Sequence, residues 1–319
     1  MMSIDYQPVL ADDRLRRDIE AIVRLAIAED LSKSVDWTTV CLVDRSAMAS
    51  CQIRSRAEGV AAGLLAIPWV ISAFTANLRC EIHVEDGDRF AAGDALVTLS
   101  GSGRDMLTAE RTILNLVSRM CGIATAASRY VAAVDGTAAK IYDTRKTTPG
   151  YRRIEKYAVR CGGANNHRTG LHDGILIKDN HIAMSGASDR QPLTLVDAVA
   201  KAIRWRGRSA SQLDVEVPPG SEPADAPEIV EVEVDTLEQY RQILPLSPNI
   251  ILLDNFSLSD LAVAVAIRND AGSAVQLESS GNVRLETVAE IAATGVDRIS
   301  SGALTHQAVS LDLGLDWIA

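Results

Sequence analysis

The chain has 319 residues, of which 47% are apolar and 23% charged. This composition allows one large or two moderate packed domains and excludes a disordered protein. Acidic residues outnumber basic ones by 42 to 32, and the net charge of −10 argues against a protein that binds nucleic acid or an anionic membrane. The five cysteines form no CxxC pair, so neither a zinc site nor a disulfide framework is indicated, and we expect reduced thiols in a cytoplasmic protein.

The first third of the chain predicts a mixture of helices and short strands. Apolar residues recur every three or four positions behind Asp12 and predict an amphipathic helix. Residues 59–78 carry no charge, but Pro68 interrupts them, so we expect a buried helix with its entry loop and no membrane span. Residues 80–99 predict short strands joined by glycine turns.

A helix is predicted next, and it carries an arginine at an unusual position. Leu107, Leu114, Val117 and Cys121 line one face of this helix. Arg111 falls on the same face. An arginine on an apolar stripe pairs with a neighbour, reaches solvent or points at an anion, and the spacing leaves these alternatives open.

From about residue 138 the chain alternates between short apolar runs and helical periods. Polar residues stand at or just after the ends of these runs, at 143–146, 178–181, 231–233, 254–255, 278–280 and 300–302. Such alternation predicts a parallel sheet with right-handed crossovers. Polar residues at the carboxyl ends of strands are typical of an α/β barrel, although a doubly wound open sheet remains an alternative. The segment 207–228 is rich in proline, serine and acid and predicts a surface loop.

Positive charge is concentrated in residues 143–182, where eight lysines and arginines face four acids. Arg145, Lys146 and Lys178 follow apolar strands, so we expect them in a barrel mouth, where they would bind carboxylates or phosphates. By contrast, Arg152, Arg153 and Lys156 fit a solvated helix face.

Two other clusters complete the candidate site. Glu233 and Asp254 end neighbouring strands, and converging carboxylates suit Mg²⁺, although pairing with nearby arginines is the alternative. Residues 279–282 and 300–302 follow the last two strands and predict a phosphate cradle at helix starts. Neither GxxxxGK[ST] nor GxGxxG occurs in the sequence, which removes the main support for an ATPase or a dinucleotide-binding protein.

Several motifs, taken in order, resemble the quinolinate phosphoribosyltransferase family. They are DTRKTTPG, EKYAVRCGG, NHR, LIKDNHI, VEVDTLEQ, ILLDNF, LESSGN and GALTH, preceded by AEDL, DWTTV, EGVAAGL and TAERTILNLVSRMCGIAT. The resemblance covers nearly the whole chain except 207–228. Ala164 replaces a glycine of the family pattern, where a negative φ is required, and Asn282 replaces a second glycine, where Asn tolerates unusual backbone angles. Ser301 replaces an apolar residue and adds a candidate phosphate donor.

The resemblance implies an α/β protein with the type II phosphoribosyltransferase fold. An open-faced α/β sandwich (1–118 with the tail 303–319) would accompany an incomplete, seven-stranded type of α/β barrel (119–302). The family also implies a head-to-tail homodimer in which Arg111 reaches the active site of the partner subunit. The implied reaction joins quinolinate to phosphoribosyl pyrophosphate with loss of CO₂, uses Mg²⁺ and needs no organic cofactor.

The resemblance also implies a role for each site residue. The residues implied around quinolinate are Arg111, Arg145, His167, Arg168 and Lys178. Lys146 and Lys178 would meet the phosphoribosyl pyrophosphate, and Glu233 and Asp254 would hold Mg²⁺ and the ribose hydroxyls. The residues implied for the 5′-phosphate are Ser280, Gly281, Asn282, Ser301, Gly302 and His306. Lys146, Lys178, Glu233 and Asp254 would be the catalytic set.

Three other functions remain as alternatives. A related phosphoribosyltransferase would keep the phosphate cradle and act on another pyridine or related carboxylate. A barrel lyase would form a Schiff base on Lys178, at a strand end. A further candidate is an anion-binding module without catalysis.

Overall fold

The computed structural model describes residues 5–186, 191–213, 215 and 225–318. Within the loop 207–228, residues 214 and 216–224 lie outside the described residues. The backbone contacts divide the chain into two compact units. The parallel-sheet unit comprises 1–7, 132–145 and 166–301, and the antiparallel-sheet unit comprises 8–131, 146–165 and 302–319.

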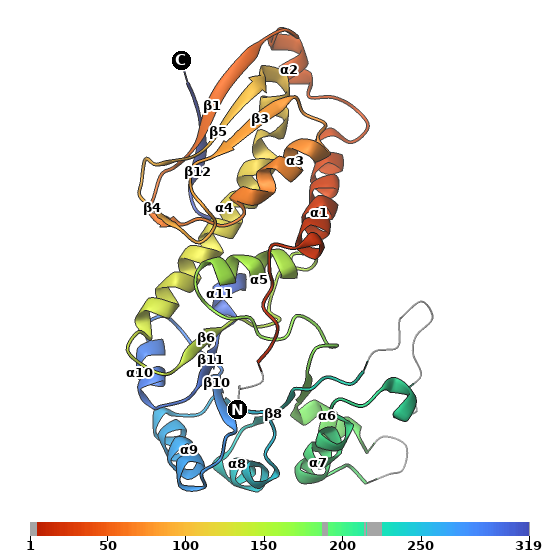
Figure 1. Cartoon of the computed structure of the whole chain (residues 1–319), viewed down its shortest axis with the longest axis vertical. Helices are drawn as coiled ribbons and strands as arrows, with labels where there is room; N and C mark the ends of the chain where they lie inside the picture. The colour runs from red at the N-terminus through yellow and green to blue at the C-terminus, as the bar shows by residue number, and fades with distance from the viewer. Residues whose placement is uncertain (1–4, 187–190, 214, 216–224, 319) are drawn as a thin grey trace. The chain divides into compact units, whose positions relative to one another are not determined.

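The antiparallel-sheet unit is built around four strands in the order β12-β1-β5-β3. Their bounds are β1 (Met48–Ser55), β3 (Leu78–Ile82), β5 (Ala95–Ser102) and β12 (Leu313–Trp317). In β1, Cys51, Ile53 and Ser55 are buried while the residues between them are partly exposed, so one face of the sheet is covered. The edge strand β12 is the C-terminal tail and pairs antiparallel with β1, which confirms that the tail completes this sheet (Figure 1).

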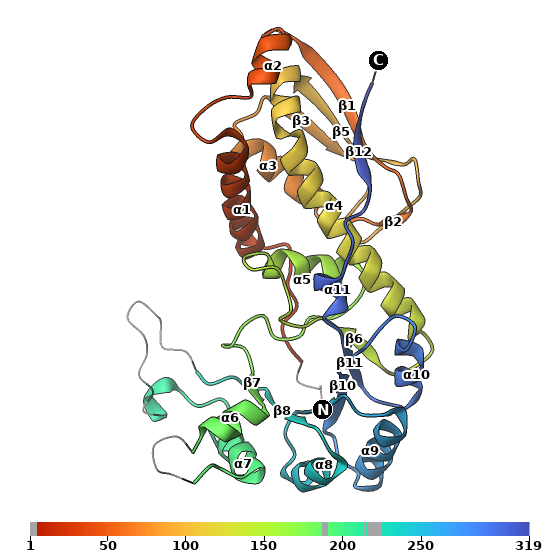
Figure 2. The ribbon, with the colours of Figure 1, turned by 180° about the vertical axis from the view of Figure 1, so that it is seen from behind.

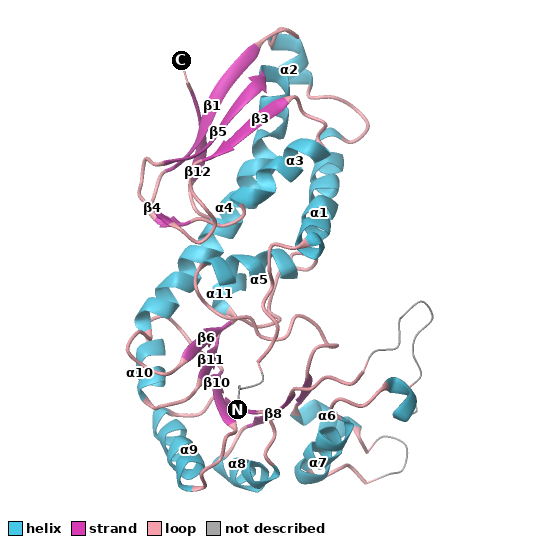
Figure 3. Ribbon diagram, viewed as in Figure 1, coloured by secondary structure: helices cyan, strands magenta, loops and turns pink. Residues whose placement is uncertain are grey.

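Helices pack beside this sheet (Figure 3). The helices and short strands of the unit are α1 (Asp13–Leu31), α2 (Trp37–Leu42), β2 (Gly59–Val60), α3 (Ile67–Ala73), β4 (Arg89–Phe90), α4 (Gly103–Ala133), α5 (Arg152–Cys161) and α11 (Ala303–His306). The α1 helix begins where the side chain of Asp12 accepts hydrogen bonds from two free backbone N–H groups, as the sequence predicts. Pro68 stands in the first turn of α3, where its missing N–H costs no helical bond. No helix among the described residues is long and apolar enough to cross a membrane.

Two helices of this unit carry the basic residues singled out above. In α4, Leu114 and Val117 are buried but Arg111 is exposed, so its side chain reaches solvent in the single chain. In α5, the expectation that Lys156 lies on a solvated face is wrong, because Lys156 is fully buried. The reason is that α5 packs between α1 and α11, so it has more than one buried side.

The parallel-sheet unit contains all six strands expected from the apolar runs. They are β6 (Lys140–Tyr142), β7 (Ile175–Ile177), β8 (Val230–Val234), β9 (Ile250–Asp254), β10 (Gln276–Ser280) and β11 (Arg298–Ser300). All the pairings are parallel, and the described order is β6-β11-β10-β9-β8-β7. A doubly wound sheet reverses its strand order at a switch point, whereas this order runs in one direction around a circle left open between β6 and β7. The unit is therefore an incomplete α/β barrel.

The helices of this unit are α6 (Asp179–Met184), α7 (Leu195–Trp205), α8 (Leu237–Ile243), α9 (Leu258–Asp270) and α10 (Val288–Ala293). Figure 2 shows α8, α9 and α10 along the outer side of the curved sheet. The strands β8 and β9 are buried on both faces, as expected where helices cover one side and the barrel interior fills the other. The carboxyl ends of the six strands consequently form one edge.

Candidate active site

The carboxyl edge of the parallel sheet collects most of the candidate site residues. Arg145 follows β6, Lys178 follows β7, Glu233 is the last residue but one of β8, Asp254 ends β9, Ser280 ends β10 and Ser301 follows β11. Because the strands are parallel, these positions share one edge of one sheet. The sequence predicts that these positions lie at one edge of the sheet, and the strand order agrees.

An ion pair links the residue after β7 to a carboxylate of β8. The ammonium group of Lys178 forms an ion pair with a carboxylate oxygen of Glu233. Burial raises the pKa of Glu233, and the neighbouring Asp254 raises it further, although Lys178 acts in the opposite direction. Asp254 in turn accepts a 2.7 Å hydrogen bond from the side chain of Asn255. Glu233 and Asp254 are therefore neighbouring carboxylates, and the charged form of Glu233 is destabilised. Such a pair suits a divalent cation, which prefers oxygen ligands.

A buried aspartate fixes the segment that carries Arg168. Asp143 is fully buried directly after β6. Its carboxylate accepts a 2.7 Å hydrogen bond from the side chain of Asn166 and a 2.9 Å bond from the backbone N–H of His167. Asp143 was not among the expected site residues. Its signal in the sequence is the strand-end position immediately before Thr144-Arg145.

Arg168 is buried to 7% exposure and is held from two sides. Its guanidinium donates to the carbonyl oxygen of Gly174 at 3.2 Å, and its backbone N–H donates to Nδ1 of His167 at 2.8 Å. Burial lowers the pKa of Arg168, and the positive charge of Arg145 lowers it further. Two guanidinium groups close enough to repel each other, one of them buried, define a place where an anion is stabilised.

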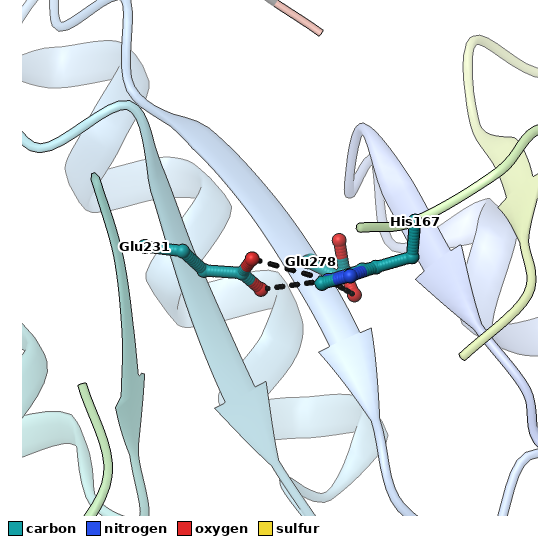
Figure 4. A group of neighbouring side chains, drawn as sticks. All are labelled: His167, Glu231 and Glu278. Carbon is teal, nitrogen blue, oxygen red and sulfur yellow. Dashed lines mark hydrogen bonds and ion pairs between the residues drawn. The ribbon is translucent and has the colours of Figure 1, made fainter. Parts of the chain in front are cut away.

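His167 lies inside the barrel between two buried carboxylates, Glu231 of β8 and Glu278 of β10 (Figure 4). Its Nε2 atom is 3.1 Å from Glu231 and 3.5 Å from Glu278. Because Nδ1 accepts the N–H of Arg168, the ring proton lies on Nε2 and is donated toward the carboxylates. Burial opposes a second proton on this ring, but the two carboxylates outweigh burial and raise the pKa of His167.

The donor set of His167, Glu231 and Glu278 resembles a metal site, but its hydrogen bonds argue against one. A metal-bound histidine uses an unprotonated nitrogen and donates through the other. Here the outward nitrogen accepts, and the inward nitrogen carries the proton. Glu278 also accepts a 2.7 Å bond from Arg298, and Glu231 accepts a 2.6 Å bond from the hydroxyl of Tyr6. The cluster is a hydrogen-bonded ion network beneath the edge.

This network includes residues that sequence reasoning missed. Arg298 lies at 3.6 Å over the ring of Tyr142 and forms a 2.8 Å ion pair with Asp5. The hydroxyl of Tyr142 donates to the same Asp5 at 2.6 Å. Alternate positions on β8, β10 and β11 point into the barrel, and acids or arginines at such positions are the signal that could have revealed them.

The turn after β10 has the backbone that a phosphate cradle needs. Gly281 has φ +89° and Asn282 has φ +51°, so Asn282 adopts the left-handed conformation expected of it. A Cβ at Gly281 would collide with the side chain of Asn255, which itself has φ +55°. The side chain of Asn282 donates to that of Asn255 at 3.1 Å. The hydroxyl of Ser301 donates to the carbonyl of Val283 at 3.0 Å.

The remaining candidates belong to the antiparallel-sheet unit. A Cβ at Gly302 would lie 2.8 Å from the Lys146 side chain and 3.2 Å from the His306 ring, so these three residues are neighbours. The hydroxyl of Thr305 donates to the backbone oxygen of Lys146 at 2.7 Å. In the same unit, Ala164 does not share the positive φ of Gly163, as the replacement of glycine at that position requires.

Comparisons with known proteins agree with this geometry. Residues 36–121 match the model "Quinolinate phosphoribosyl transferase, N-terminal domain", and residues 123–316 match the corresponding C-terminal domain model. The chain is 44% identical over 297 residues to the carboxylating nicotinate-nucleotide pyrophosphorylase of Mycobacterium leprae (92% of this chain, 95% of that protein). It is 37% identical over 269 residues to the probable enzyme of the same name from Bacillus subtilis (84% and 83%).

A solved structure gives the same result. The nicotinate-nucleotide pyrophosphorylase of Francisella tularensis superimposes with a TM-score of 0.82 at 33% identity and covers 98% of this chain and 100% of its own. The fold class is thus the type II phosphoribosyltransferase class, with a sheet domain and an incomplete α/β barrel. The chain belongs to the quinolinate phosphoribosyltransferase family.

Proposed function

We propose that this chain transfers the phosphoribosyl group of phosphoribosyl pyrophosphate to quinolinate and releases CO₂, giving nicotinate mononucleotide and pyrophosphate for NAD biosynthesis. The observation that carries the proposal is the pair of neighbouring guanidinium groups of Arg145, which follows β6, and Arg168. Arg168 is buried beside the charge of Arg145, and together they suit the two adjacent carboxylates of the acceptor. Membership of the family supports the same reaction.

The residues at the edge suit each stage of this chemistry. The pyridine nitrogen attacks the anomeric carbon of the ribose as pyrophosphate leaves. The quaternised ring then loses its 2-carboxylate as CO₂, and the resulting carbanion takes a proton from water. We propose that Arg145, His167, Arg168 and Lys178 line the quinolinate site, with His167 buried beside Arg168. Holding two reactants in register supplies about 7–11 kcal/mol of a barrier of this kind. Cations around the ring stabilise the carbanion that decarboxylation leaves behind.

We propose that Glu233 and Asp254 hold Mg²⁺ together with the ribose hydroxyls. Their fit rests on the raised pKa of Glu233, which a divalent cation would relieve. When bound, the ion would neutralise the leaving pyrophosphate. Lys178 already contacts Glu233, so it is well placed to exchange this partner for substrate phosphate when the cation binds. The reaction chemistry requires no organic cofactor.

The 5′-phosphate is assigned in the proposal to the two turns after β10 and β11. The proposed ligands are Ser280, Gly281, Asn282, Ser301, Gly302 and His306, with Lys146 on the pyrophosphate. Support comes from the left-handed backbone at Gly281 and Asn282 directly after β10, because successive backbone N–H groups in such turns form concavities that bind anions. The hydroxyl of Ser301 donates to the carbonyl of Val283, so we propose that Ser301 contributes to this site through its position in the turn more than through its side chain.

We further propose a head-to-tail homodimer in which Arg111 serves the site of the partner subunit. The exposure of Arg111 on α4, whose neighbouring residues Ile113, Leu114 and Val117 are buried, supports this role. Mixing Arg111→Ala with Lys178→Ala protein should restore part of the activity, because one site in a hybrid dimer is then intact. Absence of recovery after verified subunit exchange would contradict the shared site. The domains proposed are 1–118 with 303–319 and 119–302, supported by family matches that meet between 121 and 123. A cytoplasmic location remains part of the proposal.

The reaction is tested by supplying quinolinate, phosphoribosyl pyrophosphate and Mg²⁺ and by following CO₂ and pyrophosphate together. We expect both products in equal amounts and no product without Mg²⁺. Nicotinate in place of quinolinate should be a far poorer substrate, because it lacks the carboxylate that occupies the second guanidinium. A preference for nicotinate would instead favour the alternative, a related phosphoribosyltransferase with a different acceptor.

A Schiff-base lyase is disfavoured by the surroundings of Lys178. A lysine nucleophile of this kind is activated in an apolar pocket or beside another cation. The side chain of Lys178 is 38% exposed and contacts the carboxylate of Glu233. Borohydride trapping with a carbonyl substrate should leave Lys178 unmodified.

A further inference from the structure

The N-terminal segment of the chain contributes to the interior of the incomplete barrel. Asp5 and Tyr6 cluster with the parallel-sheet unit, although β6 begins only at Lys140. Tyr6 is 6% exposed and packs in one buried cluster with Ile229, which directly precedes β8, and Ile250, which begins β9. The segment therefore lies under the strands, on the side of the barrel interior away from the edge that carries Glu233 and Asp254.

The ring of Tyr6 touches both groups that hold Arg168. Its centroid is 4.6 Å from that of the His167 ring, at an interplanar angle of 31°. A Cβ at Gly174 would lie 2.7 Å from Cε1 of Tyr6, so the ring is packed directly against the backbone of Gly174. The carbonyl of Gly174 accepts the guanidinium of Arg168, and Nδ1 of His167 accepts its backbone N–H.

The hydroxyl of Tyr6 adds a chain of hydrogen bonds to these packing contacts. It donates to Oε2 of Glu231 at 2.6 Å. Glu231 is fully buried and accepts from Nε2 of His167 at 3.1 Å. The Tyr6 hydroxyl therefore limits the rotation of the carboxylate, the carboxylate fixes the ring proton on Nε2, and Nδ1 is left as the acceptor for Arg168.

We propose that Tyr6 is a positioning residue for the anion site: through Glu231, His167 and Gly174 it fixes the geometry in which Arg168 meets a carboxylate of the pyridine substrate. This inference rests on the proposed function, because it takes the ligand of Arg168 to be quinolinate. Tyr6 touches neither reacting atoms nor the phosphate turns, so its effect should be confined to the acceptor.

The first test compares two tyrosine-to-phenylalanine variants in the same network. Tyr6→Phe keeps the packed ring and removes the bond to Glu231. Tyr142→Phe is the matched control, because it removes a hydroxyl bond of the same 2.6 Å length to a carboxylate, that of Asp5. This carboxylate reaches His167 only indirectly, through Arg298 and Glu278. We expect Tyr6→Phe to raise the KM for quinolinate about tenfold, with the KM for phosphoribosyl pyrophosphate unchanged. Tyr142→Phe should leave both KM values unchanged.

A second test needs no turnover. Nitrogen NMR of histidine-labelled protein reports which ring nitrogen carries the proton, and a His167→Asn sample identifies the signal. At a pH above the raised pKa of His167, we expect the wild-type ring in the neutral Nε2–H form. In Tyr6→Phe we expect a mixture of the two neutral forms, whereas Tyr142→Phe should match the wild type. A double variant, Tyr6→Phe with Glu231→Gln, should raise the KM for quinolinate no further than Glu231→Gln alone, because both act through one chain of bonds.

The two tests separate the inference from the proposed function. Equal quinolinate KM values and equal His167 spectra in wild type and Tyr6→Phe would overturn the positioning role, even if the enzyme makes nicotinate mononucleotide. An equal rise in both KM values in Tyr6→Phe and Tyr142→Phe would also overturn it, because it would show a general loss of structure. If the wild type does not turn over quinolinate, the proposed function fails, while a change in the His167 signal of Tyr6→Phe would still support the network.

Discussion

Two glutamates on one strand show how the interior of the barrel differs from its edge. Glu231 and Glu233 are two residues apart on β8, so their side chains leave the same face of the strand. Burial opposes the charge of Glu231, but His167, Tyr6 and Arg298 outweigh it and lower its pKa. Burial raises the pKa of Glu233, and Lys178 does not compensate for this and for the charge of Asp254.

The difference separates a structural role from a chemical one. In the interior, the chain itself supplies partners for buried charge, so the ions stabilise a fixed arrangement. By contrast, burial and the charge of Asp254 raise the pKa of Glu233, and burial and the charge of Arg145 lower the pKa of Arg168, so a bound cation or anion would stabilise the charged forms of these groups. Substitutions in the interior should therefore change mainly stability, and substitutions at the edge should change mainly activity.

The largest effect is expected from removing cations at the edge. Arg145→Ala and Lys178→Ala should each reduce kcat/KM at least about a hundredfold, because a charge-assisted contact to a desolvated anion contributes about 3 kcal/mol. Steady-state kinetics measures the loss, and thermal unfolding should remain close to that of the wild type. Near-native activity in either variant would refute the assigned roles.

The next test exchanges the two glutamates for glutamine. Glu231→Gln should lower the free energy of unfolding by about 3 kcal/mol, because it breaks a buried ionic network. Glu233→Gln should leave stability within about 0.5 kcal/mol and weaken the dependence of activity on Mg²⁺. Urea unfolding and Mg²⁺ titrations measure the two quantities. If both variants lose stability equally, interior and edge are not distinct.

A smaller effect is expected at the phosphate turn. Gly281→Ala places a side chain at φ +89° against Asn255, so the turn must shift, and we expect the KM for phosphoribosyl pyrophosphate to rise about tenfold. Asn282→Gly is the control, because glycine also adopts φ +51° and should change this KM less than about threefold. A larger effect of Asn282→Gly would show that its side chain, and not only its backbone angle, matters.

The smallest effect concerns pH and the interior. Asp5 is partly buried, which opposes its charge, but Arg298 and hydrogen bonds with Tyr142 outweigh burial and lower its pKa below 3.8. The stabilisation is therefore complete above pH 3.8 and is lost as the pH falls through the lower value of the folded state. Asp5→Asn should cost about 1 kcal/mol at pH 6 and progressively less below pH 4. Urea unfolding at several pH values checks this, and a pH-independent difference would contradict it.

Sequence patterns were sufficient for the parallel sheet, because each of its strands is an apolar run that ends in polar residues. The same patterns did not distinguish an α/β barrel from a doubly wound sheet. The strand order depends on the direction of each crossover, and hydrophobic periodicity does not reveal that direction. That the C-terminal tail joins the N-terminal sandwich was implied only by the family resemblance, and its pairing with β1 is seen only in the structure, because no local pattern links residues so far apart.

The edge residues could be found from sequence because strand ends are visible in it, as for Lys178, Glu233 and Asp254. The contacts within the interior network could not be found, because its members come from the N-terminal segment, the loop before β7, β6, β8, β10 and β11 and meet only after folding. Tyr6 and Arg298 carry no local signal of their contact with His167 or Asp5. Lys156 was misjudged because its helix has more than one buried side, which a single amphipathic period does not reveal.

The C-terminal strand has a consequence for how the chain is made. The edge strand β12 ends at Trp317 and pairs with β1, which begins at Met48. During synthesis, the ribosome therefore has to deliver all of the barrel strands before the first sheet can gain its fourth member. Until then the edge of β1 is open to other chains, a period of exposure in which a chaperone or rapid translation of the last segment would protect the nascent protein.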